Sequence, residues 1–593
     1  MAENKFVEVD RESFPYIFMK NVDIPLKTHE KGLLRCNVYL PKDSAPYGTQ
    51  KYPVIATYGP YGKDVPYEVF FKKSWDQVNP DMKSTHASWE TPDPGFWTRQ
   101  GYIVVRTDER GSGQSPGELD TMSRGTSEAF FDVVEWCSEQ EWSSGKVGLL
   151  GISYFAGTQW RVAARQPKGL AAIIPWEGMS DYYRDRVRHG GILSDRFIDF
   201  WWKNAVQPNQ YGKPGRASRQ WGDDTLEEDL DEQTLFSNRR DQTKDTAAHR
   251  FMDEDYYNTR NLDLSSIEVP LLSVANWGGI LLHLRGNVIG WMRASSSYKF
   301  LRFIVGRHDL PFYYPHSAQL QLSFLDAFLK DNDYDGWRSG QQPRVHLCLR
   351  KGDCGVDDPE RELKFPSRAE VDWPIPDTQY TKFFLTTKQT LSREPDPSID
   401  TCTYEALTGT PITFLYKTSS SLEITGHILA RLTVSCSRES PNSSPPTDID
   451  IFVTLRKLNA DGKEVFYTGT MGDPVPIVKG WLRVSLRKIN TEHPFHRHYL
   501  PYRDYTSADV QPVKENERYQ VDVEVWPTNT VLDPNETLVL EIAGHDTQGV
   551  GKYSHEHPDD RDRAVFGGLN HIEVGQESGY LLLPIIPSRE ALN

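Results

Sequence analysis

A single serine stands where a hydrophobic strand pattern ends and a helical pattern begins. The stretch Lys146-Val-Gly-Leu-Leu-Gly-Ile-Ser153-Tyr154 runs from apolar residues into Ser153. On a strained turn between strand and helix, a nucleophile elbow, a serine hydroxyl faces the substrate and the next backbone N–H faces the developing oxyanion. Phe155 takes the place of the second glycine of the general G-x-S-x-G pattern, and a serine after a strand also serves as a helix N-cap. The segment alone therefore leaves both interpretations open.

Two more polar loops follow neighbouring strand patterns. Asp108-Glu-Arg110-Gly111-Ser-Gly113-Gln-Ser115-Pro-Gly117 comes after one, and Thr57-Tyr58-Gly-Pro60-Tyr61-Gly-Lys63 comes after the one before it. Because the carboxyl ends of parallel strands meet at one sheet edge, we expect both loops at the same edge as Ser153. The glycines of the first loop lack the spacing of a nucleotide-binding fingerprint and are interpreted as turn residues.

The elements that position these loops alternate between strand and helix patterns from about residue 30 to 345, which predicts a mainly parallel sheet covered by helices. Phe130, Val133, Val134 and Cys137 form one helical stripe, as do Leu320, Phe324 and Phe328. The predicted strands are Leu33 to Leu40, Pro53 to Tyr58, Tyr102 to Thr107, Val147 to Gly151, Leu170 to Pro175, Pro270 to Ala275 and Phe300 to Gly306.

Two changes of pattern divide the chain. Residues 180–265 are rich in charge and Trp, without strand-like runs, and predict a mostly helical insertion that caps the carboxyl edge of the sheet. A Pro- and charge-rich stretch at about 356–400 leads into alternating strand patterns with no long helical stripe, typical of a β-sandwich or jelly roll. We therefore predict an α/β domain of residues 1–179 and 266–355, the insertion of 180–265, and an all-β domain of 356–593.

Several motifs, in order, resemble one family of enzymes. They are Pro60-Tyr61-Gly-Lys63, D-x-RG-x-G-x-S-x-G at 108–117, W-x-x-G-KVG-x-x-G-x-SY at 142–154, TQW at 158–160 and G-x-H at 306–308. Together they resemble the serine hydrolases of the X-prolyl dipeptidyl-peptidase and cocaine-esterase-like group, which includes α-amino acid ester hydrolases. The resemblance covers about residues 15 to 590. It implies an α/β hydrolase with a helical cap insertion, followed by a C-terminal all-β jelly-roll (galactose-binding-like) domain; TDIDIFVTL and GWLRVSLR match that domain.

The resemblance also implies a role for each matching residue. Ser153 matches the nucleophile, and the N–H of Tyr154 is its oxyanion donor. Tyr61 matches the tyrosine whose hydroxyl completes the oxyanion hole, although a tyrosine beside Pro60 is also an ordinary turn residue. His308 matches the general base, and it comes last in the chain, as in other α/β hydrolases.

The acid of the triad departs from the pattern. Relatives place an aspartate two residues after a Trp past the penultimate strand, but here Val274-Ala-Asn276-Trp277-Gly278-Gly279 has glycine in that place. Glu177, just past the neighbouring strand, is the first candidate to orient His308. Asp181 in the same loop and Asn276 are the alternatives. Asp309 is adjacent to the histidine in sequence and is expected to point away.

The composition excludes several function classes. Lys+Arg number 67 and Asp+Glu 83, so the net charge is 67 − 83 = −16, which argues against nucleic acid as a partner. No apolar run reaches the roughly 18 residues of a membrane span, and the mean hydropathy is −0.59. Six dispersed cysteines predict a reducing compartment, so we expect a cytoplasmic protein. His493, His496, His498, His555 and His557 are interpreted as surface loop residues, and no metal or organic cofactor is expected.

The sequence thus predicts a serine hydrolase that cleaves an ester or amide acyl group through an acyl-enzyme. The aromatic residues of the insertion favour a small-molecule substrate with a bulky or aromatic group. They are Tyr182, Tyr183, Trp201, Trp202 and Trp221. Two alternatives stay open: an acyltransferase or tailoring enzyme of small-molecule metabolism, and a catalytically silent binding protein. The sequence also leaves open whether the chain forms a homo-oligomer.

Overall fold

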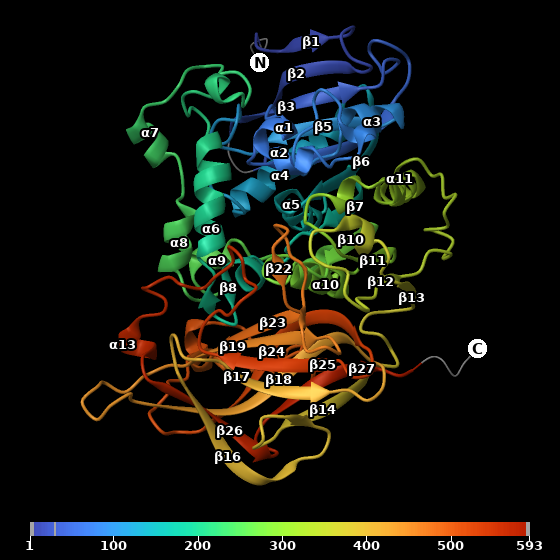
Figure 1. Cartoon of the computed structure of the whole chain (residues 1–593). Coiled ribbons are helices and arrows are strands. Elements are labelled where there is room, and N and C mark those ends of the chain that lie inside the picture. Colours follow the sequence, from blue (N-terminus) through green and yellow to red (C-terminus); the bar gives the residue numbers. More distant parts are fainter. Residues whose placement is uncertain (1–4, 29–30, 589–593) are drawn as a thin grey trace.

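A computed structural model describes residues 5–28 and 31–588 and places an α/β domain on an all-β domain (Figure 1). The α/β domain is built on an 11-stranded sheet of order β1-β2-β3-β5-β4-β6-β7-β10-β11-β12-β13. The stretch from β5 to β12 is parallel, and antiparallel strands flank it on both sides. The mainly parallel sheet predicted from the sequence is confirmed. Its strands are β1 (Glu8–Asp10), β2 (Ile17–Pro25), β3 (Leu33–Leu40), β4 (Tyr52–Gly59), β5 (Ile103–Asp108), β6 (Ser143–Ile152), β7 (Leu170–Trp176), β10 (Leu271–Asn276), β11 (Lys299–Ile304), β12 (Val345–Cys348) and β13 (Ser367–Glu370).

Helices cover both faces of this sheet, which is why its central strands are apolar throughout. Every residue of β5 and of β10 is buried. The stripe of Phe130, Val133, Val134 and Cys137 lies buried on α4, as predicted. Residues of α4, α5 and α10 belong to one apolar core, and those of α3 and α11 to a second core across the sheet. These helices are α3 (Pro94–Arg99), α4 (Arg124–Glu139), α5 (Tyr154–Ala163), α10 (Leu284–Arg293) and α11 (Pro315–Leu329).

The segment between β7 and β10 forms a helical cap. Helix α6 (Arg196–Trp201) continues without a break into π-helical η3 (Trp202–Val206) and the 3-10 turn η4 (Gln207–Asn209). Trp201 Nε1 donates to Tyr61 Oη over 2.9 Å, which ties the cap to the loop after β4. The rest of the cap is short: η2 (Tyr182–Val187), β8 (Arg188–His189), β9 (Ile192–Leu193), η5 (Ala217–Arg219), α7 (Glu232–Ser237), α8 (Gln242–Ala248), α9 (Asp255–Asn258) and η6 (Leu264–Ser266).

The all-β domain is a nearly closed barrel. Its sheet runs β15-β14-β27-β18-β24-β23-β19-β25-β17, and a bridge between Thr390 and Leu415 joins its two end strands. β16 and β26 continue it along β18. The strands are β14 (Gln379–Leu385), β15 (Leu391–Ser392), β16 (Asp396–Glu405), β17 (Ile412–Lys417), β18 (Leu422–Ser437), β19 (Asp450–Leu458), β20 (Glu464–Val465), β23 (Val478–Arg483), β24 (Tyr519–Leu532), β25 (Thr537–Ala543), β26 (Leu569–Gln576) and β27 (Tyr580–Ile586).

Shorter elements connect these parts. They are α1 (Tyr67–Phe70), α2 (Lys72–Trp75), η1 (Pro80–Met82), η7 (Pro311–Tyr313), α12 (Pro359–Glu362), β21 (Tyr467–Thr468), β22 (Pro474–Val475), η8 (Val484–Leu486), η9 (Ser507–Asp509) and α13 (Arg563–Phe566). The β21–β22 hairpin projects from the all-β domain toward β10 and α10 (Figure 1). There Thr470 O, on the loop of the hairpin, accepts the backbone N–H of His308 over 3.1 Å. The all-β domain therefore contacts the loops at the carboxyl edge of the parallel sheet.

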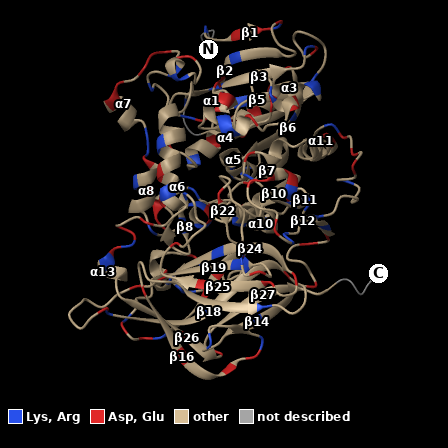
Figure 2. Cartoon of the chain, in the orientation of Figure 1, with Lys and Arg blue, Asp and Glu red and all other residues tan. Residues whose placement is uncertain are grey.

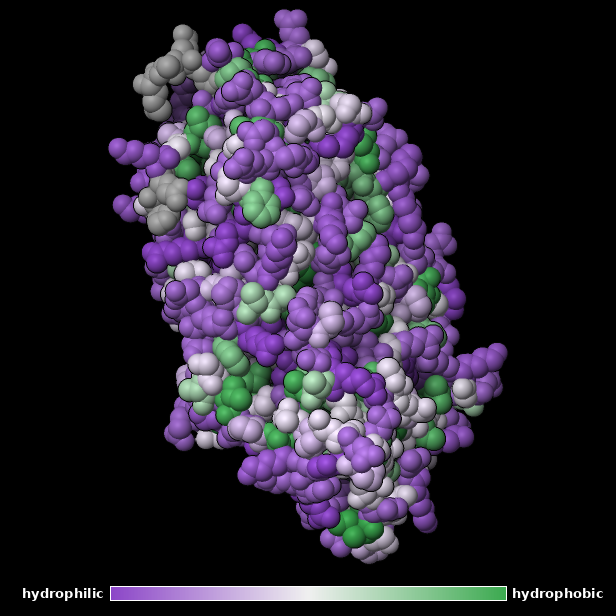
Figure 3. Space-filling model, turned by 90° about the vertical axis from the view of Figure 1, so that its left-hand side faces the viewer, coloured by the Kyte–Doolittle hydropathy of each residue, from purple (hydrophilic) through white to green (hydrophobic). Residues whose placement is uncertain are grey.

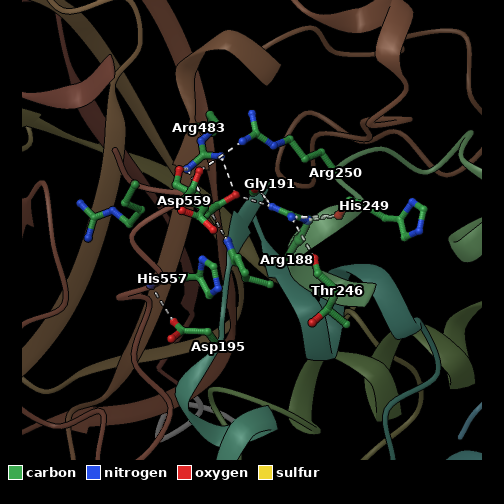
Figure 4. Close-up of polar contacts among 12 residues, drawn as sticks. Arg188, Gly191, Asp195, Thr246, His249, Arg250, Arg483, His557 and Asp559 are labelled. Carbon is green, nitrogen blue, oxygen red and sulfur yellow. Dashed lines mark hydrogen bonds and ion pairs between the residues drawn. The ribbon is translucent and has the colours of Figure 1, made fainter. Parts of the chain in front are cut away.

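A buried ionic network joins the cap to the all-β domain (Figure 4). Arg188 of β8 and Arg483 of β23 both pair with Asp560, at 2.7 and 3.0 Å, and Arg188 also donates to the carbonyls of Thr246 and His249. His555, in the same region, is fully buried and bonded to His189 and Asp546. Its interpretation as a surface residue is therefore wrong: the sequence does not reveal that the cap covers this loop.

The surface has no single dominant sign of charge. Lys and Arg alternate with Asp and Glu over both domains (Figure 2), so the net charge of −16 is spread over the molecule. The face that carries the cap is largely hydrophilic, with separate small apolar groups (Figure 3). In the described residues, no helix has both the length and the apolar character needed to cross a bilayer.

Candidate active site

Ser153 lies on a strained turn between β6 and α5. Its backbone has φ +59° and ψ −114°, a conformation that a residue with a side chain rarely adopts, and its side chain makes no capping hydrogen bond. Its N–H lies 3.1 Å from the carbonyl oxygens of both Trp176 and Glu177. The turn is thus held by the end of β7, and the hydroxyl is left free for other partners.

Phe155 fits where the general pattern has its second glycine because Gly59 and the first glycine of the pattern, Gly151, make room for it. A Cβ atom on Gly59 would lie 2.6 Å from Phe155 Cε1, and one on Gly151 would lie 2.7 Å from Phe155 Cβ. Both distances are too short for real carbon contacts. The departure from G-x-S-x-G is therefore accommodated by the ends of β4 and β6.

The hydroxyl of Ser153 is bonded to a histidine that the sequence analysis did not select. Ser153 Oγ lies 3.1 Å from Nε2 of His283, and His283 Nδ1 accepts the backbone N–H of Met179 over 3.2 Å. Burial, together with the nearby His308 and Arg186, holds the pKa of His283 well below its usual value, so the ring is neutral. A neutral ring that accepts at Nδ1 carries its proton on Nε2. His283 therefore donates to Ser153 Oγ, and the hydroxyl hydrogen of Ser153 points elsewhere.

Glu177 and His308 form a buried ion pair. His308 Nδ1 lies 2.9 Å from Glu177 Oε2, and Asn276 Nδ2 donates to Glu177 Oε1 over 3.0 Å. The N–H of Glu177 donates to the carbonyl of Val274, because β7 and β10 are neighbours in the sheet. Burial raises the pKa of Glu177, while the charge of His308 opposes that rise. The structure thus brings together the two residues that the sequence suggested as acid and base, with Asn276 behind the acid.

A second carboxylate bonds the other nitrogen of the same ring. Glu90, on the loop before α3, places Oε1 3.0 Å from His308 Nε2. Burial raises the pKa of Glu90 to about 7, an effect that the bond to His308 opposes. Although burial by itself lowers the pKa of His308, the charge and hydrogen bond of Glu177, followed by those of Glu90, raise it to about 10. Both glutamates therefore favour the protonated form of the His308 ring.

Two hydrogen-bond donors lie beside Ser153. Tyr61 Oη accepts from Trp201 Nε1, and burial raises the pKa of Tyr61 well above its usual value, so the phenol keeps its proton. The N–H of Tyr154 begins helix α5, where backbone N–H groups have no partner within the helix. The phenol hydroxyl of Tyr154 donates to Glu109 over 2.8 Å.

A cavity of about 190 Å³ opens above Ser153. Aromatic residues dominate its wall, and Glu90 and His308 are the charged residues among those that line it. Of the five aromatic residues predicted to line the pocket, Trp201 and Trp221 are part of the wall. Trp202, Tyr182 and Tyr183 are buried but are not among the described residues that line this cavity. The full lining is Tyr61, Phe70, Phe71, Trp89, Glu90, Ser153, Phe197, Phe200, Trp201, Asn204, Ala205, Trp221, Leu282, His308, Thr470, Met471 and Tyr553.

The remaining candidates lie elsewhere or act indirectly. Asp181 caps η2 and pairs with Arg184 at 2.6 Å, lining a different cavity. Asp309 accepts from Tyr67, Ser74, Trp89 and Arg307 rather than from His308. Within residues 5–28 and 31–588, no group of three or more His, Cys, Asp or Glu side chains is arranged to hold a metal ion.

Glu90 and His283 escaped the sequence analysis because neither stands in a local pattern. Glu90 lies about thirty residues beyond the end of β4, and His283 lies seven residues beyond β10, immediately before α10. Both loops follow strands that end at the same sheet edge as β6. The sequence offered one indication of Glu90 and His283: each is an ionisable residue on a loop at that edge.

Comparison with known proteins identifies related sequences and structures. Residues 32–308 match the family described as X-Pro dipeptidyl-peptidase (S15 family), and residues 336–581 match the X-Pro dipeptidyl-peptidase C-terminal non-catalytic domain. Cocaine esterase of Rhodococcus sp. (strain MB1 Bresler) is 23% identical, with 96% of this chain and 99% of the relative aligned. A crystal structure of a CocE/NonD family hydrolase from Staphylococcus aureus superposes with a TM-score of 0.80 at 27% identity, covering 96% of this chain and 94% of the other. A putative serine esterase of Mycobacterium bovis is 21% identical over 75% of this chain and 78% of its own.

Proposed function

The chain is a serine hydrolase that belongs to the X-Pro dipeptidyl-peptidase (S15) family, and from this premise we propose that it cleaves an ester or amide acyl bond through an acyl-enzyme on Ser153. The observation that carries the proposal is the convergence of Ser153, His308 and Tyr61 on one cavity, with Glu177 bonded to the far side of His308. A nucleophile, a base, an acid and an oxyanion donor are the groups that acyl transfer requires.

In the first step, Ser153 Oγ attacks the carbonyl carbon and its proton passes to Nε2 of His308. Nε2–H of His283 donates to Ser153 Oγ, so the hydroxyl hydrogen of Ser153 points away from the His283 ring. The ring of His308 stacks on that of His283 with centroids 5.0 Å apart, which makes it the remaining histidine near the hydroxyl. Glu177 holds Nδ1–H and stabilises the imidazolium that forms.

The negative charge on the carbonyl oxygen is stabilised by Tyr61 Oη–H and the N–H of Tyr154. Both donors come from rigid parts of the molecule: Tyr61 is held by Trp201, and Tyr154 by the start of α5. Donors that are fixed before the reaction do not reorganise as the charge develops. His308 then protonates the leaving group, and water repeats the sequence to release the acid.

The wall of the cavity favours a bulky apolar or aromatic group on the acyl or alcohol side. The side chains of Phe70, Trp89, Phe197 and Trp201 offer flat apolar surfaces on several sides of it. A small, strongly hydrated ester fills less of this space and leaves apolar wall in contact with water. We therefore propose that aryl or bulky alkyl esters are turned over with higher kcat/KM than acetate esters.

A fluorophosphonate probe followed by an ester panel tests the proposal. We expect the probe to label Ser153 in the parent and to leave Ser153→Ala unlabelled. We expect p-nitrophenyl esters of benzoate and of branched acids to be hydrolysed faster than the acetate. Failure of the parent to label at any pH between 6 and 10 contradicts the proposed function.

Product analysis with an added alcohol or amine separates hydrolysis from transfer to that acceptor, because only transfer yields the new ester or amide.

A further inference from the structure

His308 has a carboxylate on each of its ring nitrogens. Glu177 bonds Nδ1 at 2.9 Å and Glu90 bonds Nε2 at 3.0 Å. An ionised carboxylate only accepts hydrogen bonds, so each of these contacts needs a proton, and that proton sits on the ring or on Glu90. In either case Nε2 is occupied. A base that removes the proton of Ser153 needs a free lone pair on that same atom.

The loop that carries Glu90 is built into the site. Glu90 has φ +62°, and its carbonyl accepts the N–H of Ile152, the residue before Ser153, over 3.1 Å. The indole of Trp89 donates to Asp309, the residue after His308, over 3.1 Å. Glu90 is thus anchored to both the serine strand and the histidine loop. Backbone strain in such a place is typical of positions that a functional site requires.

One oxygen of Glu90 is uncommitted. Oε2 is buried and makes no hydrogen bond with the described residues, while Oε1 is held by His308. A buried carboxylate oxygen without a partner is unfavourable, so the residue is not placed there for stability. The side chain also lines the cavity above Ser153.

We propose that Glu90 is a positioning residue that holds Nε2 of His308 in the resting enzyme and must release it to Ser153 before acylation. The proposal rests on the roles proposed above for Ser153 and His308. First, the proton between Nε2 and Glu90 is lost to solvent and the Glu90 carboxylate turns away, so that Nε2 of the neutral ring has a lone pair. The Oγ–H proton then moves to this lone pair. At the same time an Oγ electron pair forms the bond to the carbonyl carbon, and the π pair of the carbonyl moves onto its oxygen. Glu90 exchanges no atoms with the substrate.

The arrangement has a consequence for pH. Neutral His308 is the reactive base, so the rate rises with pH through the pKa of the imidazolium. Replacing Glu90 with glutamine removes one negative charge next to Nε2, so the imidazolium loses its proton at lower pH. An opposite charge at this distance shifts a pKa by about 1 to 3 units. Other ionisable groups facing the pair stay in place: Glu177, His283, Asp309 with Arg307, Arg186, Tyr61, Tyr313 and Tyr553.

The rate of fluorophosphonate labelling of Ser153, followed from pH 6 to 10, tests the proposal. We expect the midpoint of the rising limb to be lower in Glu90→Gln by at least about one unit, which makes labelling near pH 7 about tenfold faster. Glu90→Asp, with a shorter carboxylate, is expected between the two. Glu128→Gln is the matched control, because Glu128 is also buried but pairs with Arg124 and Arg165 instead of a histidine. Its profile is expected to overlie that of the parent.

Two results overturn the proposal: a Glu90→Gln midpoint within 0.2 unit (~0.3 kcal/mol) of the parent, or slower labelling than the parent at every pH. A second measurement does not depend on the nucleophile. In Ser153→Ala, the downfield proton resonances of the His308 ring N–H groups are expected to titrate at lower pH when Glu90 is also glutamine. If the parent never labels but this difference is present, the proposed function and the release step fail, while the hold of Glu90 on the His308 ring stands. If the parent labels and the His308 titrations of Ser153→Ala with and without Glu90→Gln coincide, the proposed role of Glu90 is refuted while the proposed function stands.

Discussion

Replacing Glu177 with glutamine keeps the shape of the side chain at position 177 but exchanges donor and acceptor in its hydrogen bond with His308. Glu177 Oε1 accepts from Asn276 Nδ2, and Oε2 accepts from His308 Nδ1. Asn276 cannot turn over, because its Oδ1 accepts the N–H of Gly278 and its Nδ2 also donates to the carbonyl of Gly306. The glutamine must therefore present its oxygen to Asn276 and its NH₂ to His308. An NH₂ group facing Nδ1 forces that nitrogen to accept, so the ring proton sits on Nε2.

A histidine protonated on Nε2 alone cannot remove the proton of Ser153. In serine proteases, the corresponding amide substitution lowers the rate by about 10⁴, which corresponds to about 5 kcal/mol of transition-state stabilisation. We expect a loss of the same order in kcat for Glu177→Gln, with KM changed by no more than a few-fold. Thermal unfolding should show that the variant is folded, since the side chain keeps its volume and both hydrogen-bond contacts.

The double variant Glu177→Gln/Asn276→Ala tests whether the changed tautomer of His308 causes the loss of kcat. Without Asn276, the glutamine is free to turn its oxygen to His308 and restore the Nδ1–H tautomer. We expect it to be at least about tenfold more active than Glu177→Gln alone, although Asn276→Ala by itself lowers activity in the parent. Turnover of a p-nitrophenyl ester and the rate of fluorophosphonate labelling report both values. Glu177→Gln activity within tenfold of the parent, or a strictly additive double variant, refutes the reasoning.

Three further substitutions separate the roles at the site. Tyr61→Phe removes the phenol donor and is expected to lower kcat by about 10²–10³ with little change in KM; an equal loss in both would indicate a role in binding instead. His308→Ala should abolish labelling of Ser153, whereas His283→Ala should slow it by about tenfold, because His283 orients the hydroxyl and does not remove its proton; equal losses would contradict this division. Gly278→Ala places a Cβ 1.9 Å from the carbonyl oxygen of Thr468, so we expect a loss of about 1–3 kcal/mol of stability, measured by denaturant unfolding, and slower turnover as the β21–β22 hairpin shifts; an unchanged midpoint would show that the hairpin adapts freely.

Much of the fold follows from local patterns. The strand β3 was expected at Leu33 to Leu40 and is found with those bounds, and the stripe from Phe130 to Cys137 is buried on α4. The strand pattern GWLRVSLRKI is strand only as far as Arg483, after which η8 forms a turn. Apolar periodicity indicates where an element lies, but the end of a strand depends on what packs beyond it. Here Arg483 turns to bond Asp450 and Asp560.

The sequence by itself determined the α/β domain with its cap, the all-β domain and the sheet edge at which Ser153, Glu177 and His308 lie. The physical reason is that short strand patterns alternating with helical patterns favour a parallel sheet covered by helices, and the carboxyl ends of parallel strands meet at one edge. Only the tertiary structure decided the partners within that edge. His283 takes the hydroxyl of Ser153, and Glu90 takes the nitrogen of His308 that the serine needs. Such contacts depend on loop conformations that long-range packing sets, because the partners in these two contacts are 130 and 218 residues apart in the chain.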